Sequence, residues 1–334
     1  MKILITLLGL TFLFSSCILG AFAIPSDQNS TMLKSWNLSS PNVENDNSFA
    51  ISSTFAGGNV YFVDANSNKI GRLVPSTNTI TQWEIPTNSS SPVAIDVDTS
   101  TRNVYFVEAD ANKIGRFVPS TNTITEWEIP TNSSSPVAID VDNSDGNAYF
   151  VEADANKIGR LDPSTNTITE WEIPTNSSSP VAITKNSNNE EVYFVEADAN
   201  KIGRLDLSTN TITEWEIGTS GANLTDLTMG SGGDEVYFVE ADANKIGRLD
   251  LSTNTITEWE IPTNSSSPVA IDFDTSTRNV YFVEADANKI GRLDPSNEQF
   301  TEWSLPNEPA TIDVDSSGSI YYIDKNGKNI NRLS

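Results

Sequence analysis

The sequence predicts an all-β protein, a seven-bladed β-propeller with four antiparallel strands in each blade. Three observations support this fold class: a repeat of nearly fixed period, four strand-like runs in each repeat, and no helical periodicity. The repeat is best seen in the segment from Asn147 to Pro174. The isoleucine of its Lys-Ile-Gly-Arg core recurs every 44 residues, with a degraded seventh copy after 40, at Ile70, Ile114, Ile158, Ile202, Ile246, Ile290 and Ile330. Such a period is typical of propeller blades and of helical arrays.

The residues within one repeat favour strands over helices. Runs rich in β-branched and aromatic residues alternate with Gly, Pro, Asn, Asp and Ser, which is the chemistry of strands and turns. No window carries an apolar stripe at i, i+3, i+4 and i+7 that is long enough for a helix. In the second repeat the four predicted strands, named A to D in chain order, are Pro92 to Asp98, Asn103 to Ala109, Asn112 to Pro119 and Thr123 to Pro130.

A glycine and a tryptophan recur at fixed places in the repeat. Gly115 of strand C has no side chain, and this predicts room for a neighbouring aromatic ring such as Phe106 or Trp127. Each strand D carries one tryptophan. We expect these rings to pack between blades, with ligand stacking as the alternative. They are Trp36, Trp83, Trp127, Trp171, Trp215, Trp259 and Trp303.

The first residues predict a secretory signal peptide, Met1 to Ala23. Lys2 precedes an apolar run, Ile3 to Leu13, and a small-x-small cleavage motif ends at Ala23. The apolar run is too short for a membrane span. Cys17 lies in a poor lipoprotein box, because Phe14 stands where an aliphatic residue is expected, so a lipid anchor is the minor alternative. We therefore expect a secreted or cell-surface protein with no membrane span.

The two ends of the remaining chain are complementary. Met32 to Leu38 aligns with strand D through Trp36, but no strands A to C precede it. The chain stops at Ser334, just after strand C of the seventh repeat, Lys328 to Leu333. We expect the N-terminal strand to complete blade seven, which removes an exposed sheet edge. Residues 24–334 are then one propeller domain, expected to be a monomer.

Charge and composition exclude several functions. The chain has a formal net charge of −25, no histidine and one cysteine, Cys17. So acidic a protein will not bind nucleic acid through phosphates, but it will attract cations. Without histidine there is no Ser-His-Asp triad, and a Cys-His pair or a zinc site built on His or Cys is excluded as well.

One acidic position recurs with functional character. An acid ends strand B in all seven repeats, and most are followed by Asp and Asn two and four residues later. Oxygen ligands at alternate positions suit a hard cation such as Mg²⁺ or Ca²⁺. The B–C and D–A turns of a propeller share one face, so we expect an acidic rim near the channel mouth on the face where a ligand or protein partner binds. Alternatively, these are polar turns partly neutralised by strand C. The acids are Asp64, Glu108, Glu152, Glu196, Glu240, Glu284 and Asp324.

Seven sequons predict N-glycosylation on exposed turns, although Asn-Ser-Ser is also good turn composition. They begin at Asn29, Asn37, Asn88, Asn132, Asn176, Asn223 and Asn264.

The repeat resembles the streptogramin B lyase family, also called virginiamycin B lyases. The matching motifs are Tyr149-Phe150-Val151-Glu152, Asn156-Lys157-Ile158-Gly159-Arg160-Leu161, Ile168-Thr169-Glu170-Trp171-Glu172-Ile173-Pro174 and Pro180-Val181-Ala182-Ile183. The resemblance covers nearly all of Met32 to Ser334. It implies a seven-bladed, secreted relative of Mg²⁺-dependent C–O lyases that open a cyclic depsipeptide.

The resemblance also implies where a site would lie. The family places catalytic and substrate-binding histidines after Pro at the start of strand A in the last two blades, where this chain has Val269 and Ala310. Glu308 and Asp324 match the family's metal-binding acids. We therefore expect a non-catalytic binding module with affinity for Mg²⁺ or Ca²⁺. The alternatives are a Mg²⁺-dependent lyase or hydrolase with a non-histidine base, and a structural cell-envelope protein.

Overall fold

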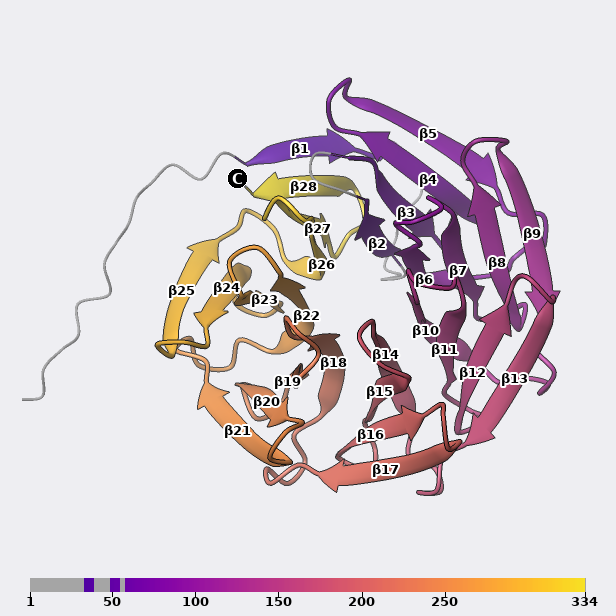
Figure 1. Ribbon diagram of the computed structural model, residues 1–334. Coiled ribbons are helices and arrows are strands. Elements are labelled where there is room, and N and C mark those ends of the chain that lie inside the picture. The colour runs from indigo at the N-terminus through magenta and orange to yellow at the C-terminus, as the bar shows by residue number, and fades with distance from the viewer. Residues whose placement is uncertain (1–32, 39–48, 55–57, 334) are drawn as a thin grey trace, which may run out of the picture. The chain divides into compact units, whose positions relative to one another are not determined.

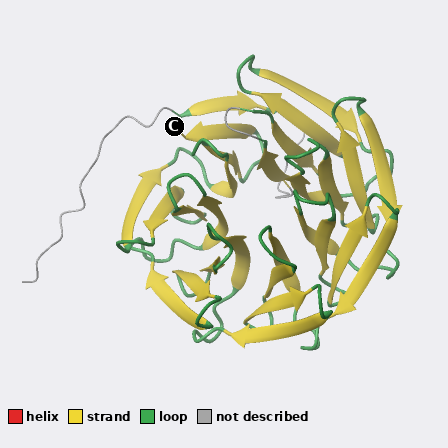
Figure 2. Ribbon diagram, in the orientation of Figure 1, coloured by secondary structure: helices red, strands yellow, loops and turns green. Residues whose placement is uncertain are grey.

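The computed structural model describes residues 33–38, 49–54 and 58–333, and strands and loops account for all of them (Figure 2). The strands form seven four-stranded antiparallel sheets. The all-β, seven-bladed prediction is therefore confirmed. The described ranges contain no helix that could cross a membrane.

Each sheet keeps the predicted A-to-D order. The A strands are β2 (Phe49–Ser53), β6 (Pro92–Val97), β10 (Pro136–Val141), β14 (Pro180–Asn186), β18 (Leu224–Met229), β22 (Pro268–Asp274) and β26 (Pro309–Val314). The B strands are β3 (Val60–Asp64), β7 (Val104–Glu108), β11 (Ala148–Glu152), β15 (Glu191–Glu196), β19 (Glu235–Glu240), β23 (Asn279–Glu284) and β27 (Ile320–Asp324).

The outer half of each sheet is equally regular. The C strands are β4 (Lys69–Val74), β8 (Lys113–Val118), β12 (Lys157–Asp162), β16 (Lys201–Asp206), β20 (Lys245–Asp250), β24 (Lys289–Asp294) and β28 (Asn329–Leu333). The D strands are β5 (Thr79–Glu84), β9 (Thr123–Glu128), β13 (Thr167–Glu172), β17 (Thr211–Glu216), β21 (Thr255–Glu260), β25 (Gln299–Ser304) and β1 (Lys34–Asn37).

The sheets are arranged as a ring. The A strands lie innermost and contact one another in order from β2 to β26, and β26 returns to contact β2 (Figure 1). The D strands lie on the outer edge, where β17 and β21 are neighbours (Figure 1). The turns that join B to C and D to A therefore come together at one end of every blade.

The N-terminal strand closes the ring as predicted. β1 pairs antiparallel with β28, with Trp36 opposite Ile330, and Leu38 N donates to Lys328 O at 2.8 Å. Trp36 is 6% exposed, and its Nε1 donates to Asn78 Oδ1 of the first blade at 3.1 Å. The observed strand is shorter than the predicted Met32 to Leu38, and Met32 lies outside the described residues.

The hydrophobic core is divided among the blade junctions. A representative cluster joins Tyr105, Val107 and Ile114 of one blade to Phe150 and Leu161 of the next. Each junction therefore buries the facing surfaces of two neighbouring blades. The tryptophans on β5, β9, β13, β17, β21 and β25 pack against these clusters but are only partly buried, and an arginine guanidinium lies 5.1 to 5.7 Å from each ring centroid.

Candidate functional site

The seven acids that end strand B occupy equivalent positions at the same end of each blade. Glu108, for example, lies opposite Pro92 on strand A and opposite Lys113 on strand C. The sequence predicted an acidic rim, but these side chains are not on the surface. They are at most 1% exposed: Asp64, Glu108, Glu152, Glu196, Glu240, Glu284 and Asp324.

The loop between strands D and A is hydrogen-bonded to the B–C turn beside the five glutamates and Asp324. In the second blade, Ala109 N donates to Ser91 O and Asp110 N to Ser90 O, which ties the B–C turn to this loop. Ser90 is fully buried, and both its backbone N and its Oγ donate to Asn68 Oδ1 at 2.9 Å. Asn68 is in the preceding blade, so the same contacts also connect neighbouring blades.

The acids differ in their hydrogen bonding. Asp64 accepts from Ser67, and Asp324 accepts from Asn329 and Asn307. In the five glutamates, both carboxylate oxygens are buried with no protein donor among the described residues: Glu108, Glu152, Glu196, Glu240 and Glu284. A buried carboxylate without a donor is costly when ionised.

Burial raises the pKa of each of these five glutamates to about 7. For Glu108, the negative charge of Glu126 raises the pKa further. Ser90 and Lys113 have a smaller, lowering effect on the Glu108 pKa, because the hydroxyl of Ser90 is donated to Asn68 and Lys113 pairs with Glu126 at 3.5 Å. These glutamates are therefore partly protonated at neutral pH, rather than a ring of full negative charges.

A second network joins five of the D–A loops to the outer strand of the next blade. Thr131 N donates to Glu170 Oε1 at 3.0 Å, and Thr131 Oγ1 donates to Glu170 Oε2 at 2.8 Å. Lys157 Nζ donates to Thr131 Oγ1 and pairs with Glu170 at 3.0 Å. The threonine and lysine donors overcome the effect of burial and lower the Glu170 pKa. The strand C lysines, which were predicted to neutralise the buried acids in part, therefore pair with strand D glutamates and have only a weak effect on the buried acids.

Glu308 and Asp324 lie close together but are already compensated by protein groups. Glu308 Oε1 forms an ion pair with Lys325 Nζ at 2.5 Å, and both oxygens of Asp324 accept hydrogen bonds from asparagines. The described residues contain no group of three or more acids that could hold a metal ion. Mg²⁺ needs near-octahedral oxygen coordination, so this donor set does not fit Mg²⁺ as it stands.

Val269 and Ala310 occupy equivalent, half-buried positions at the starts of β22 and β26. Each follows a buried proline, and in both blades the register with strand B shifts at this point. Neither side chain can accept or donate a proton.

Sequence reasoning missed a set of aspartates on the innermost strands. Asp96, Asp140, Asp272 and Asp313 each accept a hydrogen bond from a backbone N–H of the next blade's strand A, at 2.6 to 3.0 Å. Although these side chains are only half-buried, desolvation by the surrounding protein raises the pKa of each, to about 8 for Asp272. The sequence does indicate where these side chains lie. Each aspartate stands between two apolar residues of strand A, as Asp96 does between Ile95 and Val97, so its side chain points away from the core.

The described sequon asparagines are exposed, and glycosylation stays a prediction. In the four Asn-Ser-Ser sites the third residue is a buried serine that donates to an asparagine of the preceding blade. The fold therefore uses this serine whether or not a glycan is attached. The exposed positions are Asn37, Asn88, Asn132, Asn176, Asn223 and Asn264, whereas Asn29 lies outside the described residues.

Comparisons of this chain with a family model and two solved structures point to one family. The model of the virginiamycin B lyase family matches residues 33–230 and again residues 141–334. A streptogramin B lyase structure is 31% identical, with a TM-score of 0.82, and the alignment covers 91% of this chain and 97% of that one. A virginiamycin B lyase from Staphylococcus aureus is 30% identical, with a TM-score of 0.79 over 91% of this chain and 99% of that one.

Two more solved structures match this chain. A catalytically inactive histidine-to-alanine variant of the Staphylococcus aureus enzyme, with quinupristin, matches equally well at 30% identity and a TM-score of 0.79 over 91% of this chain and 99% of that one. Hydrazine synthase from Kuenenia stuttgartiensis, 11% identical with a TM-score of 0.75 over 89% of this chain and 98% of that one, shares the fold alone. No curated protein matches this chain.

Proposed function

Because this chain belongs to the virginiamycin B lyase family yet contains no histidine, we propose that it is a non-catalytic binding module of that family. The absence of histidine is the observation that carries the proposal. The Staphylococcus aureus relative is described as catalytically inactive after a single histidine is changed to alanine. By resemblance, this chain has Val269 and Ala310 where the family has its histidines, and neither can act as a general base.

Loss of catalysis does not require loss of binding. The inactive Staphylococcus aureus variant was obtained with quinupristin. We therefore propose that this protein binds a ligand or protein partner on the face of the B–C and D–A turns and releases it chemically unchanged. The predicted signal peptide supports a secreted or cell-surface location, and residues 1–23 lie outside the described part of the chain.

A lyase or hydrolase with a different base is less well supported. Glu284 pairs in register with Pro268, beside Val269, and burial raises its pKa to about 7, a suitable value for a general base. However, Glu284 is fully buried beneath the D–A loop. A base must come within hydrogen-bond distance of the proton it removes, and a covered carboxylate does not do so.

The proposal is tested by incubating the purified protein with quinupristin and Mg²⁺ beside an active streptogramin B lyase. Because ring opening by elimination leaves the mass unchanged, the product is identified by its retention time and fragmentation. We expect the antibiotic to remain intact in this protein, since loss of a general base costs roughly 10²- to 10⁴-fold in rate. Ring opening at a rate comparable to that of the control enzyme contradicts the proposal.

Divalent-cation binding by Glu308 and Asp324 stays a prediction, and it requires Lys325 to leave Glu308. It is measured as thermal unfolding in EDTA against millimolar Mg²⁺ or Ca²⁺ at constant ionic strength. A cation that binds only the folded chain, at a hundred times its dissociation constant, stabilises it by about 2.7 kcal/mol. The site is supported if the cation raises the unfolding temperature of the wild type but not that of the double variant Glu308→Gln with Asp324→Asn. Equal unfolding in both media rules it out.

A further inference from the structure

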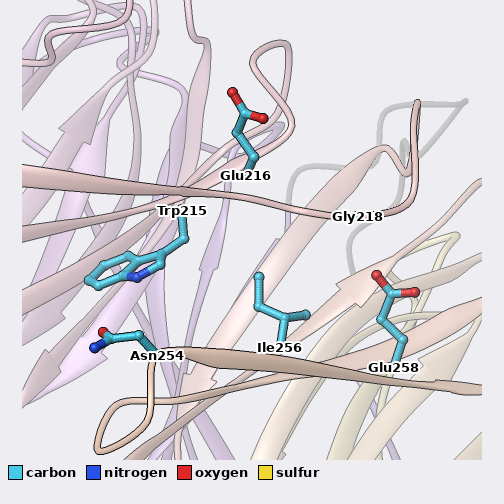
Figure 3. A pocket seen from close by; sticks show the side chains of 6 residues that line it. All are labelled: Trp215, Glu216, Gly218, Asn254, Ile256 and Glu258. Carbon is cyan, nitrogen blue, oxygen red and sulfur yellow. The ribbon is translucent and has the colours of Figure 1, made fainter.

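A groove on the outer edge of the ring lies between the D strands β17 and β21. Its volume is about 550 Å³, and it is lined by Trp215, Glu216, Gly218, Asn254, Ile256 and Glu258. In Figure 3, Trp215 extends from β17 toward Asn254, while Ile256 and Glu258 point from β21 toward β17. Glu216 points away from β21. The groove runs along the outer edge of the ring, and its Gly218 end adjoins the D–A loop at the border of the proposed binding face. Ligand binding in this groove does not depend on the proposed function.

The repeat is interrupted at this junction. Gly218 stands where five other repeats have proline, two residues after the end of strand D: Pro86, Pro130, Pro174, Pro262 and Pro306. The loop that follows, Thr219 to Asn223, also departs from the Thr-Asn-Ser-Ser-Ser of its neighbours. A β-carbon placed on Gly218 would lie 3.8 Å from Glu258 Oε1. A proline ring extends beyond that β-carbon, so glycine leaves the space beside this oxygen open.

The hydrogen bonding of Glu258 also differs from that of its counterparts at the other junctions. At four other junctions, a threonine N–H donates to the equivalent Oε1 at 3.0 to 3.2 Å. The side-chain contacts of Glu258, from Thr219 Oγ1 and Lys245 Nζ, both go to Oε2 at 2.8 Å. Thr219 N still lowers the Glu258 pKa slightly, but it does not reach hydrogen-bond geometry with Oε1. One carboxylate oxygen therefore faces the groove with capacity to accept.

The lining combines apolar and acidic groups. Trp215 and Ile256 offer apolar surface, and Glu258 lies at the end of the groove beside Gly218 (Figure 3). A lysine side chain has the matching form, since its methylene stem packs on apolar surface while its ammonium donates to a carboxylate. We propose that this groove binds a lysine side chain of a basic peptide, with the stem against Trp215 and Ile256 and the ammonium at Glu258 Oε1.

The surrounding charge favours a cationic ligand. The chain carries a net charge of −25, which attracts basic partners. Lys245 occupies Oε2 of Glu258, but the carboxylates of Glu258, Glu240 and Glu260 all raise the Lys245 pKa, so the local field is negative. A neutral sugar could also stack on an indole ring. It gains nothing from this field, and the experiment includes it as the competing ligand.

The test measures binding of fluorescein-labelled Gly-Lys-Gly-Lys-Gly-amide by anisotropy at 150 mM NaCl, which screens non-specific attraction. The acetyl-lysine version of the peptide and cellotetraose as competitor are the comparison ligands. The variants are Gly218→Pro, which installs the residue that five repeats already have, and Glu258→Gln. The matched control is Glu214→Gln. It removes the same charge at a junction where Pro174 is present and Thr175 N occupies Oε1 at 3.1 Å.

We expect the lysine peptide to bind the wild type and Glu214→Gln equally, and to bind Gly218→Pro and Glu258→Gln at least about tenfold more weakly. Loss of one charge-assisted hydrogen bond has roughly this effect. Acetylation of the lysines should abolish binding. Equal binding to all four proteins indicates general attraction to an acidic surface and overturns the proposal. Displacement by cellotetraose, or tight binding of the acetylated peptide, overturns it as well. Because Glu258→Gln leaves the backbone unchanged, poor folding of Gly218→Pro alone does not affect the conclusion.

Discussion

At the scale of the residue, the packing of strands B and C depends on the close approach of one glycine to one phenylalanine. In six blades the strand C glycine pairs with the strand B phenylalanine, as Gly159 does with Phe150. A β-carbon on Gly159 would lie 2.1 Å from Phe150 Cζ, far inside contact distance. The prediction that Gly115 makes room for Phe106 is confirmed by the same geometry in the second blade.

Substituting Gly159→Ala should therefore destabilise the protein by about 1 to 3 kcal/mol, the usual cost of overpacking a core. Urea unfolding of the variant, with its midpoint compared with that of the wild type, measures this. The double variant Gly159→Ala with Phe150→Leu is the control, because the smaller side chain removes the clash. If the single substitution leaves the midpoint unchanged, the phenylalanine moves aside at no cost and the argument is wrong.

Residue chemistry also shows what the sequence could not predict. The acids that end strand B were placed correctly along the chain, since strand ends follow from the repeat. Their burial depends on Ser90 bonding to Asn68, 22 residues away and in another blade. Nothing in the local sequence around Glu108 indicates that contact. The effect of Gly218 was missed for the same reason, because its consequence appears only where β17 meets β21.

At the scale of the secondary-structure element, the short strand β1 stabilises the closed ring. It supplies the fourth strand of the last blade and places Trp36 in a core cluster with Phe49, Phe62 and Ile330. This cluster joins the last blade to the first, so β1 holds the junction at which the ring closes. The sequence predicted this because the orphan strand and the missing strand are both visible in the repeat.

Trp36→Ala should cost about 3 to 5 kcal/mol, the usual range for removing a buried tryptophan. The substitution also removes the hydrogen bond to Asn78 and the contact with Lys34 Nζ, 4.6 Å from the ring centroid. Thermal unfolding of this variant is compared with that of Leu33→Ala, whose side chain is 41% exposed just before β1. We expect a clear decrease for Trp36→Ala and little change for Leu33→Ala. Equal effects would mean that the strand does not secure the ring.

Buried carboxylates are distributed around the whole ring, so the molecule should respond to pH as a unit. The raised values, about 7 for the five glutamates and for Asp226 and about 8 for Asp272, lie above the ordinary values for these side chains. Between roughly pH 4.5 and 8 the folded chain thus binds more protons than the unfolded chain. Stability then falls as pH rises. The acids with lowered pKa, such as Glu170 and Glu214, act oppositely, and their contribution is lost only below about pH 4.5.

The urea midpoint should therefore be highest near pH 5 and should decrease steadily toward pH 8. One group contributes at most about 1.4 kcal/mol per pH unit to this slope. Glu152→Gln removes one titrating group and supplies a neutral side chain of the same shape, so the variant should show a shallower pH dependence and exceed the wild type in stability at pH 8. Glu172→Gln, on the exposed end of β13, is the matched control and should leave the slope unchanged. A wild-type midpoint that rises from pH 5.5 to pH 8 would show that the buried glutamates stay ionised, and it would refute this account of the ring.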